Sequence, residues 1–263
     1  MSTQSPLAPL MGLALGMALL PAPASAADGM VGMGLGVAPP YPGAREVILV
    51  PLPALEVTTG AVTWRTNNFG VEAGLPLGGG VSAGPILRVD AGRGSLFAVK
   101  DAVIARLVRV KAAPEAGGFV EFGRPLGAGV QLRGRASLVQ GFGAGHGGPL
   151  GEASVTVLVP AAPRLMLGVS LQASWQDRRY AEAYFGVDRV GAAASGLLEF
   201  AGRAGLRDLG VGFVASRTLS RRWSASLLGT LSRLQGSAAR SPVVRLRGRA
   251  EQVCGGLALA YRF

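Results

Sequence analysis

The last residues of the chain alternate between large apolar side chains and small or polar ones. Side chains of a strand point to opposite faces with a period of two, so the large ones share one face: Leu257, Leu259, Tyr261 and Phe263. A strand with lipid on one side and a lumen on the other needs this pattern, with an aromatic residue at the bilayer interface. The closing strand of a soluble sandwich shows the same alternation. This pattern alone leaves both classes open, and the other end of the chain favours the membrane.

The N-terminal residues have the layout of a secretory signal peptide. An apolar stretch, Leu7 to Leu20, is broken by Pro21 and Pro23, and Ala24-Ser25-Ala26 forms a cleavage site of the A-x-A type. The stretch is too short, and its exit too rich in proline, for a membrane-spanning anchor. No Lys or Arg precedes it, which departs from the usual layout. We expect a cleaved signal peptide over residues 1–26 and one barrel domain over residues 27–263.

Strands with one apolar and one polar face recur through the mature chain. The clearest are residues 130–138, 165–176 and 223–232, and in the first of these Arg133 and Arg135 fall on the polar face. Residues 30–37 are rich in glycine, and residues 46–58 are apolar on both faces. Counting such segments predicts an all-β protein, an antiparallel transmembrane β-barrel of about twelve strands, with ten or eight as alternatives.

The lengths of the connections predict how the barrel sits in the membrane. The connections at 176–179 and 218–221 are short, whereas those at 187–204 and 234–249 are long. Barrels of this class keep short turns in the periplasm and long loops outside, so both termini are expected to face the periplasm. A short connection at 160–163 disturbs this order, because it falls on the predicted outer side. Residues 101–110 have a helical apolar period and predict a short helix near the periplasmic rim.

The composition agrees with a barrel and argues against several kinds of chemistry. Hydrophobic residues make up 49 % of the chain, yet outside the N-terminal stretch they are spread along short segments, as barrel strands require. The single cysteine, Cys254, excludes an intramolecular disulfide and falls on the inward face of the last strand. Residues 143–148 match G-x-G-x-x-G around the single histidine, His146, but a strand follows where a phosphate site needs a helix. Glu121, Glu152, Asp177 and Glu199 are scattered along the chain. We therefore predict no catalytic residue, no cofactor and no metal site.

Basic residues dominate the charge of the chain. The formal net charge is +11, and all but two of the 26 basic residues are arginines. They are spread over strands and loops and no nucleic-acid-binding module is visible, which argues against a nucleic-acid partner. Guanidinium groups pair well with phosphates, so we expect anion or lipopolysaccharide contacts from the four arginines that gather before the last strand, where Glu251 is the nearby negative charge: Arg240, Arg245, Arg247 and Arg249. A general compositional bias toward arginine would give the same count, and this alternative stays open.

Several segments resemble a known family. They include Pro40-Tyr41-Pro42-Gly43, Tyr184-Phe185-Gly186-Val187 followed by Ser195-Gly196, the run from Ala204 to Gly210, and the closing Gly256 to Phe263. These motifs are similar to those of the MipA/OmpV family of outer-membrane proteins. The resemblance implies an outer-membrane barrel. For one branch of the family it also implies a scaffold that joins a lytic murein transglycosylase to a peptidoglycan synthase.

The sequence leaves three classes of function open. The first is a non-enzymatic scaffold or interaction protein of the cell envelope in the outer membrane, in contact with outer-membrane lipid and lipopolysaccharide and, by resemblance, with the murein enzymes. The second is a small-solute channel, and the third is a barrel-embedded lipid hydrolase, which the missing triad disfavours. We also expect Leu257, Leu259, Tyr261 and Phe263 to act as the assembly signal by which the last strand is inserted and closes the barrel.

Overall fold

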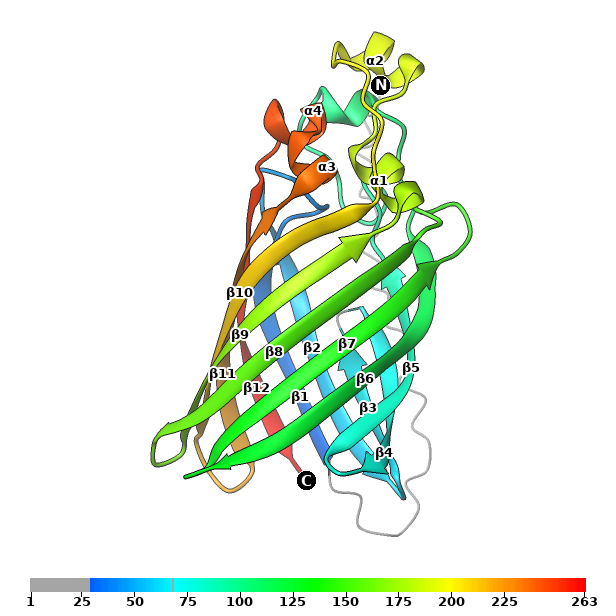
Figure 1. The fold of residues 1–263 in the computed structure, drawn as a ribbon. Helices are drawn as coiled ribbons and strands as arrows, with labels where there is room; N and C mark the ends of the chain where they lie inside the picture. Colours follow the sequence, from blue (N-terminus) through cyan, green and yellow to red (C-terminus); the bar gives the residue numbers. More distant parts are fainter. Residues whose placement is uncertain (1–28, 68) are drawn as a thin grey trace, which may run out of the picture.

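The protein folds into a closed antiparallel barrel (Figure 1). The computed structural model describes residues 29–67 and 69–263, so the expected signal peptide, residues 1–26, lies outside the described part of the chain. Each strand pairs with the next one in sequence, and β1 pairs with β12 to close the wall. This confirms the prediction of about twelve strands. The strands are β1 (Gly29–Ala38), β2 (Ile48–Thr59), β3 (Val62–Asn67), β4 (Gly70–Gly78), β5 (Val81–Asp90), β6 (Ala113–Gly127), β7 (Val130–Gly141), β8 (Pro149–Ala162), β9 (Leu165–Gln176), β10 (Gly205–Thr218), β11 (Trp223–Leu234) and β12 (Glu251–Arg262).

The two faces of the wall carry the chemistry that the alternation predicts. Along β9, Leu167, Val169 and Leu171 are exposed on the outside, while Ser170 and Gln172 line a cavity inside the barrel. A surface of exposed aliphatic residues is stable only against lipid, so the outer face is the membrane-facing one. Over the described residues, no helix is long and apolar enough to cross a membrane.

The barrel has two unlike ends, which we call the turn end and the loop end. At the turn end lie both the start of β1 and the C-terminus, where the Phe263 amide donates to the Gly29 carbonyl at 3.1 Å. Tight turns join the strands there, and several place a residue at positive φ, such as Gly129 at 76° and Arg164 at 66°. The long connections all lie at the opposite, loop end, where Figure 1 shows the helices stacked above the barrel.

Two of the predicted connections were placed at the wrong end. The connection at 176–179 is not a short turn: β9 ends at Gln176, and Asp177 then caps α1 (Arg178–Phe185) by accepting a hydrogen bond from the Tyr180 amide at 2.8 Å. The connection at 160–163 is not on the outer side, because β8 continues to Ala162 and turns at the turn end. Both errors arose from strand boundaries, and correcting them makes the order of turns and loops regular.

The helices at the loop end form a packed structure, which we call the cap. It contains η1 (Ile104–Arg106), α1, α2 (Arg189–Ser195), α3 (Gly236–Arg240) and α4 (Pro242–Arg245). The segments are far apart in sequence, yet they share one hydrophobic core, whose largest buried side chains from the cap are Ile104, Tyr184, Phe185, Val243 and Val244. Ser241 ties two of the segments together, because its hydroxyl donates to the Phe185 carbonyl at 2.6 Å.

The predicted helix over residues 101–110 was wrong in extent and in place. The structure has only the single turn η1 there, and the segment belongs to the cap at the loop end, not to the rim beside the termini. The apolar period was nevertheless informative, because Ile104, Leu107 and Val110 are all buried in the cap core. Apolar residues in an irregular loop can face one core without a regular helix.

The closing seam generates a prediction about assembly. Phe263 is half exposed on the outer face, and its ring stands so close to Gly29 of β1 that a Cβ at position 29 would collide with it. Phe263→Asp places a charge at the membrane interface beside the β1–β12 seam, so we expect a several-fold lower yield of heat-modifiable, folded barrel.

The matched control is Val190→Asp, which changes an exposed aliphatic residue of α2 far from the seam. We expect it to fold with the yield of the unchanged protein, as measured by the mobility shift of unheated samples on electrophoresis. Normal folding of Phe263→Asp would contradict an assembly role for the terminal aromatic residue.

Candidate functional site

The interior of the barrel is crossed by a network of ion pairs at about mid-height, which we call the lumen network. It contains Arg65 of β3, Glu72 of β4, Glu121 of β6 and Arg135 of β7. Arg65 pairs with Glu72 through Nε and with Glu121 at 2.6 Å, while Arg135 reaches Glu72 at 2.5 Å and Glu121 at 3.2 Å. Each arginine contacts both carboxylates, so the four charges neutralise one another across the lumen.

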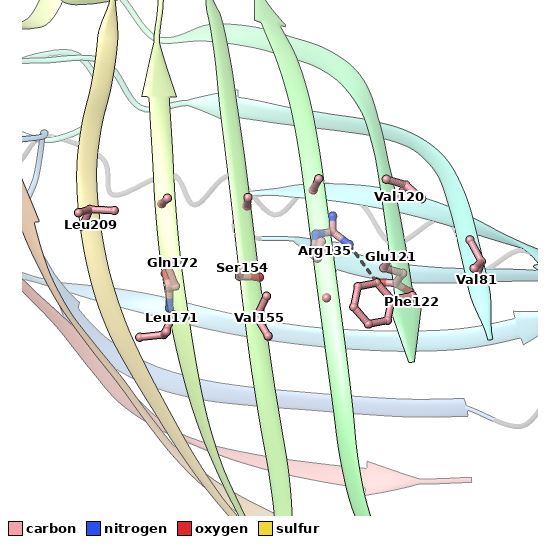
Figure 2. Close-up of a pocket in the computed structure, with 14 residues that line it drawn as sticks. Val81, Val120, Glu121, Phe122, Arg135, Ser154, Val155, Leu171, Gln172 and Leu209 are labelled. Atoms are coloured by element: carbon pink, nitrogen blue, oxygen red, sulfur yellow. Dashed lines mark hydrogen bonds and ion pairs between the residues drawn. The ribbon is translucent and has the colours of Figure 1, made fainter. Parts of the chain in front are cut away.

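Neighbouring groups fix the geometry of this network. The Ser82 hydroxyl donates to the second oxygen of Glu121 at 2.9 Å. The guanidinium groups of Arg65 and Arg135 lie over the ring of Phe119, at 5.3 and 4.2 Å from its centre, an arrangement that favours cations. The dashed line in Figure 2 marks the pair between Arg135 and Glu121. Buried charges are stable only when paired and hydrogen-bonded, and this network meets both conditions.

A second group of charges lies nearer the loop end. Arg88 of β5 contacts Glu115 of β6 at 2.5 Å and Glu152 of β8 at 2.9 Å. Glu115 also contacts Nε2 of His146 at 2.9 Å. The residue that sequence reasoning placed in a glycine-rich turn is therefore buried, and it connects the β7–β8 loop to the wall. Gly141 is needed there, because a Cβ at that position would overlap the His146 ring.

The hydrogen bonds of His146 limit its chemistry. Its Nδ1 accepts from the Gly148 amide at 3.2 Å, so the proton is on Nε2 and is donated to Glu115. Neither ring nitrogen is left to take a proton from a serine, which a hydrolytic triad requires. Through these two contacts His146 holds the β7–β8 loop against Glu115 of the wall.

An aromatic stack continues from His146 into the cap. The ring centre of His146 is 4.7 Å from that of Tyr180, which is 4.8 Å from that of Tyr184. The Tyr184 hydroxyl donates to Asp90 at the end of β5, at 2.5 Å. Burial raises the pKa of both tyrosines well above the ordinary value, so both stay neutral; the Tyr184 hydroxyl donates to Asp90, and the Tyr180 hydroxyl accepts from Arg207. The stack joins α1 to the top of the barrel.

A β-bulge aims two charged residues into the same space. Register between β9 and β10 shifts between Leu206 and Asp208, which leaves Arg207 as the extra residue. Two consecutive side chains can then point inward, which a regular strand forbids. Arg207 pairs with Asp208 at 2.6 Å and donates to the Tyr180 hydroxyl at 3.0 Å and to Ser174 at 3.1 Å. The bulge therefore connects the wall to the cap.

Three cavities follow one another inside the barrel. The lower cavity, of about 890 Å³, lies at the turn end and is lined by the lumen network's Arg65, Glu121 and Arg135. The side cavity, of about 310 Å³, runs along β7–β9 from Arg135 to Glu152. The upper cavity, of about 650 Å³, begins at Glu152 and lies below the cap. Shared lining residues make the three adjacent, with charged groups at each junction.

One groove lies on the outer surface. It has a volume of about 570 Å³ and crosses the wall from β5 to β10. Val120, Phe122, Val155 and Leu171 border it, as labelled in Figure 2, and small residues such as Ala153 form its floor. Its outward lining is apolar, so it belongs to the lipid-facing surface.

The structure separates the four predicted loop arginines. Arg240, Arg245 and Arg249 are exposed at the loop end, as a contact with lipopolysaccharide would need. Arg247 is already paired with Asp101 of the β5–β6 loop, at 2.8 Å. The expectation that Glu251 supplies the nearby negative charge was wrong, because Glu251 pairs instead with Arg233 at 3.4 Å. Sequence distance hid Asp101, which only the folded cap brings to this loop.

The residues of the predicted assembly signal lie together on the outer face of β12. Leu257, Leu259 and Phe263 are exposed there, and the Tyr261 ring packs edge-on against Trp223 at 5.2 Å. Cys254 is half buried on the inward face of the same strand, where it lines the upper cavity. Their placement agrees with the predicted alternation, and their role in assembly stays a prediction.

Sequence reasoning missed most of the interior charges. Only Arg135 and Glu121 were singled out among the lumen network, and neither was assigned a partner. The available signal was an ionisable residue in the inward register of an otherwise apolar strand, which marks a functional or structural site in a membrane protein. Residues with that signal are Arg65, Glu72, Arg88 and Glu115.

The Asp101–Arg247 pair makes the cap sensitive to acid. Partial burial raises the pKa of Asp101, but hydrogen bonds from Arg247 and from the Ile104 and Val103 amides outweigh it and lower the pKa below its ordinary value. A lowered pKa in the folded state adds stability above the unfolded-state pKa, and this stability is lost as the pH falls through the folded-state value. We therefore expect Asp101→Asn to speed hydrogen exchange of the cap segment 101–110 at neutral pH.

The difference between the two proteins should begin to shrink below the pKa of an unfolded Asp, about 3.9, and should shrink further as the pH falls through the lower folded-state pKa of Asp101. Exchange measured by mass spectrometry at matched pH values checks this. Glu251→Gln is the control, because its partner Arg233 lies outside the cap core. A difference between unchanged protein and Asp101→Asn that persists undiminished at pH 2 would contradict the ion-pair explanation.

Comparison with known proteins identifies the family to which this barrel belongs. The family model of the MltA-interacting protein MipA matches residues 31–263. No curated protein matches the chain in sequence. An outer-membrane channel from Pseudomonas putida F1 is 10 % identical with a TM-score of 0.47, covering 90 % of this chain and 95 % of its own. The NanC porin is 7 % identical with a TM-score of 0.44, covering 90 % of this chain and all of its own. The translocator domain of the autotransporter NalP from Neisseria meningitidis is 10 % identical with a TM-score of 0.41, covering 93 % and 91 %.

The family match covers nearly every described residue, from β1 to the terminal Phe263. It includes the cap motif around Tyr184 and Phe185 as well as the closing strand. The family match and the exposed apolar outer face both indicate a barrel of the outer membrane. This chain belongs to the MipA family and is an outer-membrane β-barrel protein.

Proposed function

We propose that this protein is a non-enzymatic scaffold of the outer membrane, which holds periplasmic cell-wall enzymes against the membrane. The observation that carries the proposal is a crown of arginines at the turn end, which we call the basic rim. Its members are exposed and lie in or next to the tight turns: Arg124, Arg133, Arg164, Arg217, Arg221, Arg222 and Arg262. In the described part of the chain, the acidic groups at this end are Glu56 and the terminal carboxylate of Phe263.

The basic rim is placed where a periplasmic partner would meet it. Short turns of outer-membrane barrels face the periplasm, and the rim arginines lie at those turns. A surface of one charge sign attracts and orients a partner of the opposite sign. The matched family is named for an interaction with MltA. These points together support a lytic murein transglycosylase, and with it a peptidoglycan synthase, as the partners.

The interior supports a structural role over transport and catalysis. Ion pairs cross the lumen, a packed cap covers the loop end, and His146 has both ring nitrogens engaged. Each of these features holds strands and loops in fixed positions. A rigid barrel with an organised rim is suited to presenting a surface.

A small-solute channel is the second candidate, favoured by one observation. The lower, side and upper cavities share lining residues and so form one chain of spaces through the barrel. Steady unitary conductance of the purified protein in a planar bilayer would favour this candidate over the scaffold.

The scaffold proposal predicts partners that depend on the basic rim. Tagged protein extracted from its native membrane should enrich a murein transglycosylase or a peptidoglycan synthase, as quantified by mass spectrometry. Changing Arg164, Arg221 and Arg222 to Gln should lower that recovery several-fold, because the exposed rim charges no longer attract the partner. Unchanged recovery in this variant would refute the rim as the contact surface, and no enrichment from the unchanged protein would refute the scaffold.

The loop-end arginines serve as the matched control and carry a prediction of their own. We propose that Arg240, Arg245 and Arg249 contact lipopolysaccharide phosphates, whereas Arg247 is occupied by Asp101. The triple Gln variant should therefore bind lipopolysaccharide more weakly in a pull-down while keeping its recovery of cell-wall enzymes. Arg247→Gln alone should leave lipopolysaccharide binding unchanged. Equal binding by the triple variant would attribute these arginines to composition.

A further inference from the structure

The wall of the barrel is incompletely paired along one strand. β2 is paired with β1 from Ile48 to Val57, but within the described residues its ladder with β3 covers only four residues, Glu56 to Thr59. Past that point, Thr66 alone bridges the two strands, as its hydroxyl accepts from the Leu55 amide at 3.1 Å and donates to the Pro53 carbonyl at 3.2 Å. The upper half of β2 is therefore an edge inside an otherwise closed barrel.

Two prolines of β2 occupy positions whose backbone nitrogen faces the unpaired side of the strand. The Leu55 amide points toward β3, and amides on one side of a strand belong to alternate residues, so positions 53 and 51 also face the unpaired side. Pro51 and Pro53 have no N–H to leave unsatisfied there. Proline is confined to edges of this kind because it cannot donate to a ladder. The sequence of β2 thus fits an open edge at membrane depth, where an unpaired amide would be costly.

The upper cavity extends through the wall at this edge. Its lining includes Leu52 and Ala54 on the inward face of β2 and also Pro51 and Pro53 on the outward face. This lining, together with the missing β2–β3 ladder above Glu56, places the cavity at the open edge. Across the opening it reaches Phe69 and Phe97, whose rings are 6.2 Å apart.

The surroundings of the opening are those of the bilayer. Leu49, Val71 and Leu87 on the adjoining strands are exposed and apolar on the outer face. The cap core lies above the cavity, and the lumen network lies between it and the lower cavity. The opening beside β2 therefore gives the upper cavity a sideways route from lipid.

The chemistry of the cavity changes from apolar to charged along this route. The outer part is bordered by prolines, aliphatic residues and the two phenylalanines, and the inner part by Arg88, Arg207, Asp90, Glu115 and Glu152. Both arginines are already ion-paired, Arg88 with Glu115 and Glu152, and Arg207 with Asp208. An added anion would meet carboxylates that outnumber the cations, whereas a neutral or cationic group would not.

We propose that the upper cavity binds a single-chain amphiphile with a neutral or cationic head, which enters sideways from the membrane between β2 and the β3–β5 wall. The hydrocarbon chain lies between the β2 prolines and Phe97, and the head contacts the inner charged groups. The cavity volume is in the range of small-molecule sites. A peptide strand is a poorer occupant of the edge, because Pro51 and Pro53 cannot donate to it. This proposal is independent of the scaffold function.

Cys254 provides a reporter, because its half-buried thiol lines the inner part of the upper cavity. The protein in lipid vesicles is treated with dodecyl methanethiosulfonate, which partitions into the bilayer, and the added mass is followed by intact-protein mass spectrometry. We expect Cys254 to be modified. Ala54→Phe places a ring in the opening and should slow this reaction several-fold, while Ala225→Phe, on the lipid face of β11, should not.

A small aqueous reagent, 2-aminoethyl methanethiosulfonate, reports whether the reactivity of the Cys254 thiol itself is altered, and it should react equally with all folded forms.

In the unchanged protein, dodecan-1-ol should protect Cys254 from the dodecyl reagent better than dodecanoate does, so the test does not depend on the folding of any variant. Modification by the aqueous reagent alone, or no modification by either reagent, would overturn lateral entry. Equal protection by the two competitors would overturn the preference for a neutral or cationic head.

Discussion

The constraint on which this structure depends is that backbone amides and carbonyls in a bilayer must find partners within the protein. Water is absent there, and each unsatisfied group costs several kcal/mol, or about the strength of one hydrogen bond in an apolar medium. Closure of β1 on β12 pairs the first strand with the last. The alternation of side chains follows from closure, since one face must then meet lipid and the other a lumen. The exposed leucines of β9 and β12 and the charged interior are two consequences of one backbone requirement.

Inside the barrel the dominant problem is the stabilisation of charge. The lumen network and the Arg88 group connect strands that are not neighbours, such as β4 with β7 and β5 with β8. Removing one glutamate of the lumen network would take a partner from both arginines and leave positive charge uncompensated, which is more damaging than never having placed the charges there. These pairs therefore favour one register and one barrel shape. The bulge at Arg207 and the His146–Tyr180–Tyr184 stack connect this wall to the cap.

The sequence was sufficient for properties that depend on local alternation. The outward faces of β9 and β12 and the inward direction of Arg135 and Cys254 follow from a period of two. Boundaries were less accessible: Asp177 was assigned to a turn, although it caps α1, because a capping residue and a turn residue look alike in sequence. The ion-pair partners of the charged residues could not be predicted from the sequence. Asp101 and Arg247 are brought together only by the cap, and the four members of the lumen network come from four strands. Pairings between distant segments depend on closure of the whole barrel, which no local pattern reports.

The unpaired half of β2 is instructive because it departs from the constraint that governs the rest. An accidental gap would leave amides facing lipid, and selection for stability would fill it. Here Pro51 and Pro53 remove two of the donors at that edge, Thr66 satisfies the Leu55 amide and the Pro53 carbonyl, and a cavity lies behind the edge. Three independent features thus make one opening tolerable within an apolar medium. Because the cap is packed over the loop end, an opening beside β2 would bring the upper cavity into contact with the membrane.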